Sequence, residues 1–194
     1  MKNLPSFLIP LQQIGPPSMQ PAVGGGAVSS GSIRPPFAGQ SQLQTYWCWA
    51  AVSASVADFY GGNSWTQCSI AGAELNLACC GDPTAAAPCN KPYYLQRALT
   101  RVGHLANWTS GNVDISTLKQ EIGGSRPLCC RIEWANSGGD GHFVTLTGWS
   151  IDDTGIEYVD VEDPFSGFVQ LPKKKFESGY YNSGDQWTHS YFTS

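Results

Sequence analysis

The sequence predicts an α+β fold with an antiparallel sheet, because helical patterns fill its first half and strand patterns its second half. From residue 48 onward, several segments place apolar residues at helical spacing and end at glycine. From residue 127 onward, short runs rich in Val, Ile, Thr and aromatic residues alternate with turn sequences. Helices followed by closely spaced strands are typical of a fold in which the two kinds of element segregate.

The expected helices are defined by their apolar spacing and by the residues at their ends. In "CWAAVSASVADFY", apolar residues recur at helical spacing from Trp49 to Phe59, and Gly61 follows as a stop signal. Asp114 is a suitable N-cap for the segment "ISTLKQEIGG". Helices are therefore expected over residues 48–60, 68–79, 91–103 and 114–124.

Five later runs have the composition of strands. The turn sequences "NSGGDG", "DDTG" and "DPFSG" separate the first four of them, which is the pattern of consecutive hairpins. The expected strands cover residues 127–134, 142–150, 156–162, 167–171 and 187–193.

The first 40 residues differ in composition from the rest of the chain. They are rich in Pro, Gly, Ser and Gln and show no apolar periodicity, which indicates a flexible tail or pro-segment. A single folded domain is expected over residues 41–194. The stretch "SIRPPFAGQ", directly before that domain, is a candidate self-processing site.

Charge and hydropathy argue against two classes of partner. Only 13% of the 194 residues are charged and the net charge is −4, whereas nucleic acids are bound through basic patches. The run Lys173-Lys174-Lys175 is expected to be a solvated loop. No apolar run is long enough to span a membrane, and prolines interrupt the short apolar run of "MKNLPSFLIPLQQ", so no classical signal peptide is visible.

The seven cysteines are many for this length, and their odd number leaves at least one outside any set of internal disulfides. Six in disulfides with Cys48 free would imply an oxidising compartment, but buried thiols are an equally supported alternative. A zinc site is disfavoured because the spacings contain no C-x-x-C pair. Cys129 and Cys130 are neighbours on a strand and should face opposite sides of the sheet. The seven are Cys48, Cys68, Cys79, Cys80, Cys89, Cys129 and Cys130.

Cys48, in the stretch "QLQTYWCWAA", is the candidate nucleophile. It is expected at the start of a helix, where unpaired backbone N–H groups stabilise a thiolate. A thiol nucleophile also needs a histidine that accepts its proton and later delivers that proton to the leaving group.

Among the three histidines, His142 is the best candidate for that role. It follows the glycine-rich turn "NSGGDG" and opens the strand "HFVTLTGW", so a rigid strand would hold it beside a cleft. A surface histidine at a strand start is the alternative. His104 follows a helix-ending glycine and His189 lies in the last strand, and neither has comparable surroundings.

An acid on the next strand is expected to orient the histidine. If that strand forms a hairpin with the His142 strand about the turn "DDTG", Asp163 returns to the level of His142. Asp160 and Glu162 are the nearby alternatives. Pro164 would end the strand directly after Asp163, although a common turn-initiating Asp-Pro is the other interpretation.

A glutamine upstream of the nucleophile is the candidate oxyanion donor. A side-chain amide, together with the backbone N–H of the nucleophile, stabilises the oxyanion of a tetrahedral intermediate. Gln42 lies six residues before Cys48, Gln44 lies four before it, and Gln40 is also near.

These segments together resemble the papain-like cysteine proteases of clan CA. The order is Gln42, then "CWAA" opening a helix, then "GHFVTLTGW", then the Val-x-Asp-Pro of "VEDP". The resemblance is closest to the avirulence-effector proteases of plant pathogens and to the bacteriocin-processing peptidases. It covers residues 42–194, nearly four fifths of the chain.

The resemblance implies a papain-like fold, with an N-terminal helical half and a C-terminal antiparallel sheet half, and a cleft between them that binds an extended peptide. It makes Cys48 the nucleophile, His142 the general base and acid, Asp163 the orienting residue and Gln42 the oxyanion donor. Trp47 and Trp49 would then pack the helix start tightly beside an accessible thiol, unless they are ordinary aromatic core.

The implied function is that of a cysteine endopeptidase that needs no cofactor and no metal. Its partners would be a protein or peptide substrate and an inhibitor or immunity protein, with no nucleic acid and no membrane. A secreted bacterial effector or toxin, delivered to another cell, is the implied setting.

Two other classes of function remain open on the sequence alone. An acyltransferase, a transglutaminase or a glutamine deamidase would use the same Cys-His-Asp triad and the same acyl-enzyme. A non-enzymatic cysteine-rich binding module would instead have an unreactive or disulfide-bonded Cys48.

Overall fold

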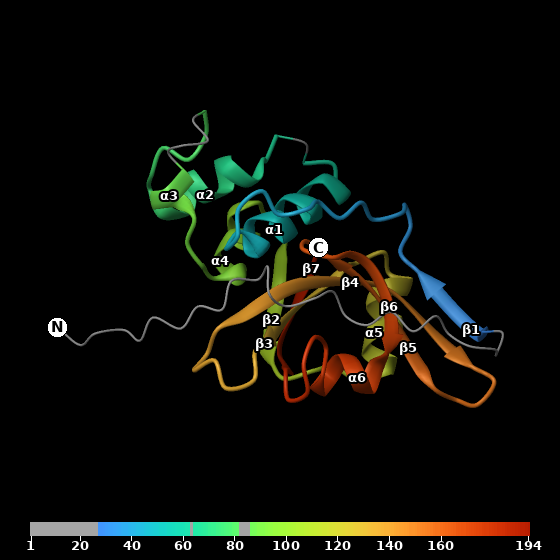
Figure 1. Ribbon diagram of the computed structural model, residues 1–194. Helices are drawn as coiled ribbons and strands as arrows, with labels where there is room; N and C mark the ends of the chain where they lie inside the picture. Colours follow the sequence, from blue (N-terminus) through green and yellow to red (C-terminus); the bar gives the residue numbers. More distant parts are fainter. Residues whose placement is uncertain (1–26, 63, 82–85) are drawn as a thin grey trace.

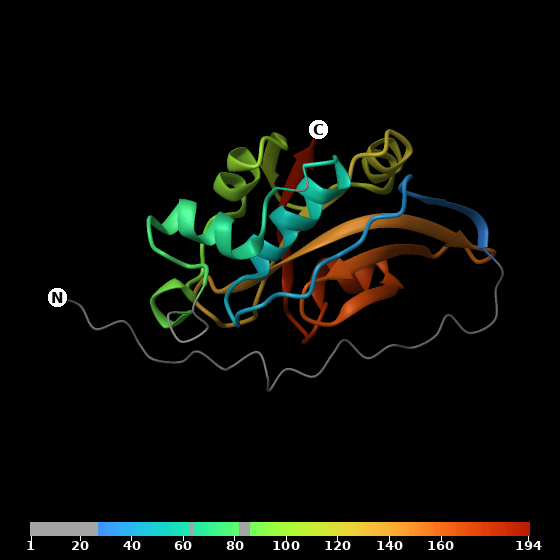
Figure 2. The ribbon, with the colours of Figure 1, turned by 90° about the horizontal axis from the view of Figure 1, so that it is seen from above.

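The computed structural model describes residues 27–62, 64–81 and 86–194. Helices α1 to α4 gather above one sheet, and α6 lies below it (Figure 1). Viewed from above, helices α1 to α4 cover only one part of the sheet, and the hairpin of β4 and β5 extends beyond these helices (Figure 2). The fold is therefore mixed α+β with an antiparallel sheet, as the sequence predicts, although one strand (Ala27–Ser32) precedes the helices and another (Leu105–Ser110) lies among them.

The sheet runs in the order β2-β7-β3-β4-β5-β6, with all neighbours antiparallel. Strand β4 is long and has two partners on one edge, because its first half pairs with β3 and its second half with β1. The strands are β1 (Ala27–Ser32), β2 (Leu105–Ser110), β3 (Leu128–Glu133), β4 (Gly141–Asp152), β5 (Glu157–Asp163), β6 (Gly167–Pro172) and β7 (Gln186–Thr193).

The helices begin at capping residues where the sequence provides them. The Thr66 side chain caps α2 in a capping box with Ser69, and the Asp114 side chain accepts the Thr117 N–H at 2.7 Å to cap α5. The helices are α1 (Cys48–Phe59), α2 (Gln67–Leu75), α3 (Ala86–Cys89), α4 (Leu95–Arg101), α5 (Ile115–Gly123) and α6 (Lys173–Ser178).

Two expected helices are shorter than their patterns suggest. The helix expected over residues 68–79 ends at Leu75, because Asn76 adopts a left-handed conformation (φ 54°) and stops it. The helix expected over residues 91–103 begins only at Leu95, after an extended Tyr94. Cys79 lies in the segment lost from the first of these helices and pairs with Cys89 at the end of α3.

Residues 27–40, which composition assigns to the tail, include a strand and pack against the domain. Gly31 lies against Trp149, where an added Cβ would meet the indole Nε1 at 2.7 Å. The backbone N–H of Ile33 donates to the Thr147 carbonyl at 2.8 Å, and Ile33 and Phe37 are buried. The candidate self-processing stretch is therefore largely engaged with the fold, whereas residues 1–26 lie outside the described residues.

The expected solvated loop at residues 173–175 is wrong for its first residue. Lys173 begins α6 and is only 6% exposed. Its ammonium pairs with Glu177 one turn later and lies 5.9 Å from the centre of the Trp187 ring. The long aliphatic stem is thus buried while the charge is satisfied locally, which sequence counting of charges does not show.

The two sides of the sheet bury separate cores. Cys129 joins the core formed with α1, α2 and α4, whereas Cys130 joins the core formed with α5 and α6. This confirms the expectation that the two neighbouring thiols face opposite sides of the sheet. Within the described ranges, no helix is long and apolar enough to cross a membrane.

Candidate active site

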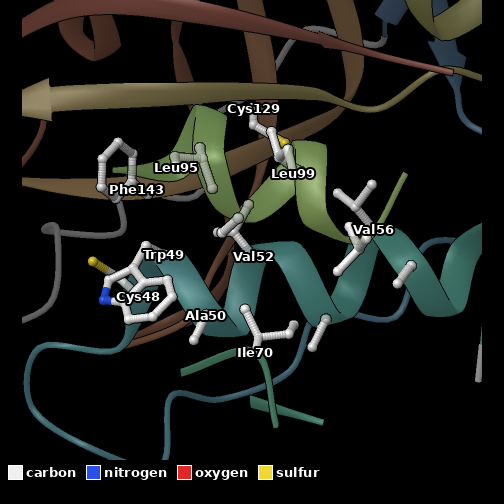
Figure 3. Close-up of a cluster of buried hydrophobic side chains, with 14 of the residues drawn as sticks. Cys48, Trp49, Ala50, Val52, Val56, Ile70, Leu95, Leu99, Cys129 and Phe143 are labelled. Atoms are coloured by element: carbon white, nitrogen blue, oxygen red, sulfur yellow. The ribbon is translucent and has the colours of Figure 1, made fainter. Parts of the chain in front are cut away.

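Cys48 is the first residue of α1 and lies at the edge of the first core. Trp47, at the N-cap position, makes no side-chain cap, so the backbone N–H groups of the first turn are not consumed by a cap. In Figure 3 the sulfur of Cys48 points away from the other labelled side chains, whereas Val52 faces the α4 residues Leu95 and Leu99. The packed body of α1 therefore fixes the position of Cys48, a residue that is 7% exposed.

The two tryptophans beside Cys48 hold the helix start to a neighbouring loop. The Trp47 indole N–H donates to the Cys89 carbonyl at 2.8 Å, and the Trp49 indole N–H donates to the Lys91 carbonyl at 3.0 Å. Both rings are buried. The tryptophans are thus core residues and loop anchors at once, which explains their place on either side of a cysteine.

His142 is the second residue of β4 and is fully buried. Its Nε2 lies 2.8 Å from Oδ1 of Asp163. Its Nδ1 is buried and forms no hydrogen bond with the described residues, although the Cys48 side chain is close enough to raise the pKa of the ring. Trp134 stacks on the imidazole at 5.8 Å with an interplanar angle of 13°. One ring nitrogen is therefore oriented, and the other is available for a proton of Cys48.

Asp163 is the last residue of β5 and faces the same end of the hairpin as His142. The Asp152 side chain accepts the Thr154 and Ile156 N–H groups and shapes the β4–β5 turn. Directly after Asp163, the Pro164 carbonyl accepts the backbone N–H of Gln42 at 2.8 Å. This bond ties the segment before Cys48 to the turn after Asp163.

The surroundings favour an ion pair between His142 and Asp163. Burial by itself would lower the pKa of His142, but Asp163 and then Cys48 outweigh it and raise the pKa to about 10. Burial by itself would raise the pKa of Asp163, yet His142, the Tyr181 hydroxyl and the Phe165 N–H lower it below its usual range. Both shifts act in the direction that favours an imidazolium paired with a carboxylate.

Gln42 lies in the segment before α1, and its amide is engaged with its own loop. Nε2 donates to the Thr45 carbonyl at 2.7 Å and to the Gln44 carbonyl at 3.1 Å, whereas Oε1 is buried without a hydrogen-bond partner among the described residues. Both amide N–H groups are therefore used in this conformation. An oxyanion role requires that one of these bonds be exchanged for the oxyanion.

The alternative residues have other partners. The Gln40 amide N–H donates to Asp58 at 2.7 Å, and Gln44 contributes its backbone to the Gln42 loop. Asp160 accepts from the Gln170 amide at 2.7 Å, and burial raises the pKa values of Asp160 and Glu162.

The other two histidines lie away from this site. Nδ1 of His104 lies 2.7 Å from the Ser194 carbonyl, and its ring stacks on Tyr60. The His189 ring lies against Trp108 and Tyr191. Neither histidine contacts Asp163 or Cys48 through any described interaction.

Three aromatic residues around the pair were not predicted from the sequence. Tyr180 and Tyr181 donate hydroxyl hydrogen bonds to Asp163, and Trp134 covers the His142 ring. The tyrosines follow a short helix and lie 17 and 18 residues after the aspartate. In the sequence, Tyr180 and Tyr181 are distinguished only by being adjacent, and this does not indicate which residue their hydroxyls would contact.

The cysteines divide between disulfides and buried thiols. Cys68 pairs with Cys80 and Cys79 with Cys89, whereas three cysteines are free. Burial raises the pKa of Cys129 to about 12, and burial also raises that of Cys130 well above its usual range. The expectation of six cysteines in disulfides is therefore wrong, because Cys129 and Cys130 are buried thiols on opposite sides of the sheet and only four cysteines are paired. The described residues contain no cluster of side chains suited to a metal ion.

Solved structures similar to the chain include three proteases of low sequence identity. The cysteine protease Amb a 11 of ragweed pollen, in its proform, has 12% identity and a TM-score of 0.49 over 91% of this chain and 64% of that one. The bromelain protease of Ananas comosus, in complex with the E64 inhibitor, has 12% identity and a TM-score of 0.48 over 79% of this chain and 92% of that one. A double glycine motif protease from an AMS/PCAT transporter, in complex with the leader peptide, has 18% identity and a TM-score of 0.43 over 87% of this chain and 94% of that one.

This chain thus spans less than two thirds of the ragweed proform. Among curated proteins, none matches the chain significantly. A family model described as papain-like cysteine protease AvrRpt2 matches residues 30–177, which include Cys48, His142 and Asp163. That match covers most of the chain and begins within β1, and this chain therefore belongs to the AvrRpt2 family of papain-like cysteine proteases.

Proposed function

We propose that this protein is a cysteine endopeptidase in which Cys48, His142 and Asp163 hydrolyse peptide bonds. The observation that carries the proposal is that the two nitrogen atoms of the His142 ring have different surroundings. Nε2 is held by Asp163 at 2.8 Å, while Nδ1 is buried and forms no geometric hydrogen bond within the described part of the chain, and the nearby Cys48 side chain raises the pKa of the ring. A ring fixed at one nitrogen and free at the other suits a group that shuttles one proton.

The reaction follows from that arrangement. The Cys48 thiolate attacks the carbonyl carbon of the peptide bond, and the carbonyl oxygen becomes an oxyanion. The imidazolium of His142 gives its Nδ1 proton to the leaving amine, which leaves an acyl-enzyme thioester on Cys48. Neutral His142 then removes a proton from water, the hydroxide attacks the thioester, and the thiolate and imidazolium return with release of the acid.

Two donors are proposed for the oxyanion. The backbone N–H of Cys48 is at the free N-terminal end of α1, where the helix dipole also favours negative charge. The Gln42 amide is the second donor, after one of its bonds to the carbonyls of Gln44 and Thr45 is given up. The backbone bond from Gln42 to the Pro164 carbonyl supports this role, because it ties the segment of Gln42 to the turn after Asp163.

The protease is proposed to be secreted or delivered to another cell. Two disulfides favour an oxidising environment at some stage of the protein's life. Family membership supports an effector that acts on proteins of another cell, and the substrate is proposed to be a protein or peptide in an extended conformation.

The direct test is labelling of the full chain with the epoxide inhibitor E64, followed by peptide mapping. We expect one label per molecule, on Cys48, while Cys129 and Cys130 serve as internal controls because they are fully buried thiols. Labelling should slow about 100-fold or more in His142→Ala, as loss of acid–base help predicts, but not in the matched variant His104→Ala.

Equal labelling of the wild type and His142→Ala would contradict the proposed thiolate–imidazolium pair. The type of acyl transfer is then decided by products. Mass spectrometry of a protein digest should show new peptide termini, whereas a side-chain deamidation or a cross-link without cleavage would favour the alternative enzymes that share this triad.

A further inference from the structure

The Asp163 carboxylate accepts five hydrogen bonds, and its two oxygen atoms have separate partners. Oδ1 accepts from His142 Nε2 at 2.8 Å, from the Phe165 N–H at 2.7 Å and from the Ser166 N–H at 3.3 Å. The backbone donors belong to the turn that follows β5. Oδ1 is thus shared between the histidine and the chain directly after the aspartate.

Oδ2 is occupied by two tyrosine hydroxyls from another part of the chain. Tyr180 donates at 2.9 Å and Tyr181 at 2.6 Å. With the His142 bond, all five partners of Asp163 are donors, which only the ionised carboxylate can accept without a clash of protons. The side chain is 0% exposed, so these bonds replace the water that an exposed carboxylate would have.

We propose that Tyr180 and Tyr181 are positioning residues of this site, because their hydroxyls hold Oδ2 of Asp163 in the orientation that keeps Oδ1 on His142. The inference rests on the proposed roles of His142 and Asp163 in catalysis. Without the two hydroxyls, only the bonds at Oδ1 resist rotation of the carboxylate about its χ2 angle, and the ionised Oδ2 is left buried without donors.

The loop that carries the tyrosines is fixed independently of Asp163. Asp185 accepts the N–H groups of Tyr181 at 3.2 Å and Asn182 at 2.7 Å through Oδ2, and that of Ala135 at 3.0 Å through Oδ1. Asp185 is 1% exposed. The tyrosines therefore act on Asp163 from a braced loop, and their position is not a result of the contact itself.

The two tyrosines differ in burial and in the rings that they contact. Tyr180 is fully buried and packs edge-on against Phe176 at 5.2 Å. Tyr181 is only partly buried, and its ring meets His142 edge-on at 6.1 Å and Trp134 edge-on at 5.3 Å. Tyr180 is thus a fixed donor from the core, whereas Tyr181 both donates and covers the imidazole from solvent.

The titratable groups that act on this carboxylate come from each element around it. They are His142 from β4 and the two tyrosines from the loop before β7, while the Cys48 thiol acts on His142 and Tyr181. The hydrogen bond from Tyr181 is among the causes that lower the pKa of Asp163. Removing it should therefore make Asp163 easier to protonate.

The experiment compares Tyr180→Phe, Tyr181→Phe and the double variant with Tyr158→Phe. Phenylalanine keeps each ring and removes only the hydroxyl. Tyr158 is a matched control because its hydroxyl also donates to a carboxylate, Asp152, at 3.3 Å but on the far end of the hairpin. All variants are made in the full chain.

Two readouts follow the acid side of the pH range. The first is 13C NMR of the aspartate carboxyl carbons, with the Asp163 signal assigned by its loss in Asp163→Asn. The second is the low-pH limb of the rate at which iodoacetamide alkylates Cys48. We expect the Asp163 midpoint to rise by about one pH unit in Tyr181→Phe, and further in the double variant, as loss of a hydrogen bond to a buried charge predicts. Tyr158→Phe should leave both readouts unchanged.

The outcomes separate this inference from the proposed peptidase. An Asp163 midpoint that is the same in all the variants would overturn the positioning role and make the tyrosines ordinary packing residues. A wild-type Cys48 that reacts no faster than in His142→Ala would instead contradict the peptidase, while the NMR titration would still decide the tyrosine inference. If the double variant does not fold, the two single variants decide it.

Discussion

Adding one methyl group at Gly141 should disturb the site through the backbone alone. Gly141 is the first residue of β4, directly before His142, and it pairs with Glu133 of β3. A Cβ at this position would lie 2.3 Å from the Ile132 carbonyl oxygen, 3.2 Å from the Ile132 carbonyl carbon and 3.3 Å from the Glu133 Cα. All three neighbouring atoms belong to the backbone of β3, so the clash cannot be relieved by a change of side-chain rotamer.

The size of the effect follows from those distances. Real Cβ contacts are essentially never shorter than 3.0 Å, so the strands must separate by at least 0.7 Å (3.0 minus 2.3) at this point. Overpacking of this kind costs about 1–3 kcal/mol of stability. Because Ile132 is paired directly with His142 and β4 lies between β3 and β5, the same shift would disturb the geometry of the 2.8 Å contact between His142 and Asp163.

The assay combines urea unfolding of Gly141→Ala with the rate of Cys48 alkylation by iodoacetamide. Gly123→Ala is the matched control, because Gly123 ends α5 and nothing lies within 4 Å of its added Cβ. We expect Gly141→Ala to lose about 1–3 kcal/mol and to alkylate more slowly. Gly123→Ala should be neutral or gain up to about 1 kcal/mol. A Gly141→Ala protein as stable and as reactive as the wild type would refute this reasoning.

Three further predictions concern charge, a disulfide and the oxyanion. The His142 pKa, raised from 6.5 to about 10, gives stability that is fully present below pH 6.5 and lost as pH rises through 10, by at most about 1.4 kcal/mol per pH unit. The lowered pKa of Asp163 gives stability that is present above the usual pKa of a carboxyl group and is lost as pH falls below it. In Asp163→Asn, urea unfolding measured across the pH range should show neither the loss of stability at high pH nor the loss at low pH. Replacing Cys79 and Cys89 by serine should lower the free energy of unfolding by about 2–3 kcal/mol. It should also slow the labelling of Cys48, because the segment that accepts the tryptophan indole hydrogen bonds is released. Unchanged labelling would show that this segment is independent of the site. Gln42→Ala should lower kcat for peptide cleavage about 100-fold or more but change alkylation, which forms no oxyanion, only slightly; equal losses in both assays would make Gln42 a loop brace.

Much of the sheet follows from local sequence, and so does the spacing of the candidate triad. The turn "DDTG" is short, so the register of the β4–β5 hairpin is fixed within narrow limits, and Asp163 returns to the level of His142. The start of α1 at Cys48 is equally local, because apolar spacing and the following glycines define that helix. These features depend on residues near one another in the chain.

Other elements were not predictable because their partners are remote. The strand β1 has no apolar alternation of its own and is stabilised by pairing with the second half of β4. The strand β2 is mostly exposed and is held by pairing with β7. A strand at a sheet edge gains its hydrogen bonds from the neighbour, so its own sequence carries little of the signal.

The sequence by itself determined helices α1, α2, α4 and α5, strands β3 to β7 and the candidate nucleophile, base and acid, because periodicity, turns and hairpin register are local properties. Only the tertiary structure decided which cysteines form disulfides and which hydroxyls surround Asp163. It also placed the Gln42 amide on its own loop. The disulfides and the tyrosine bonds join residues 10 to 18 positions apart, beyond the spacing of a helix turn or a tight hairpin, so packing selects them. The Gln42 bonds are local, but they belong to an irregular loop that no periodic pattern describes.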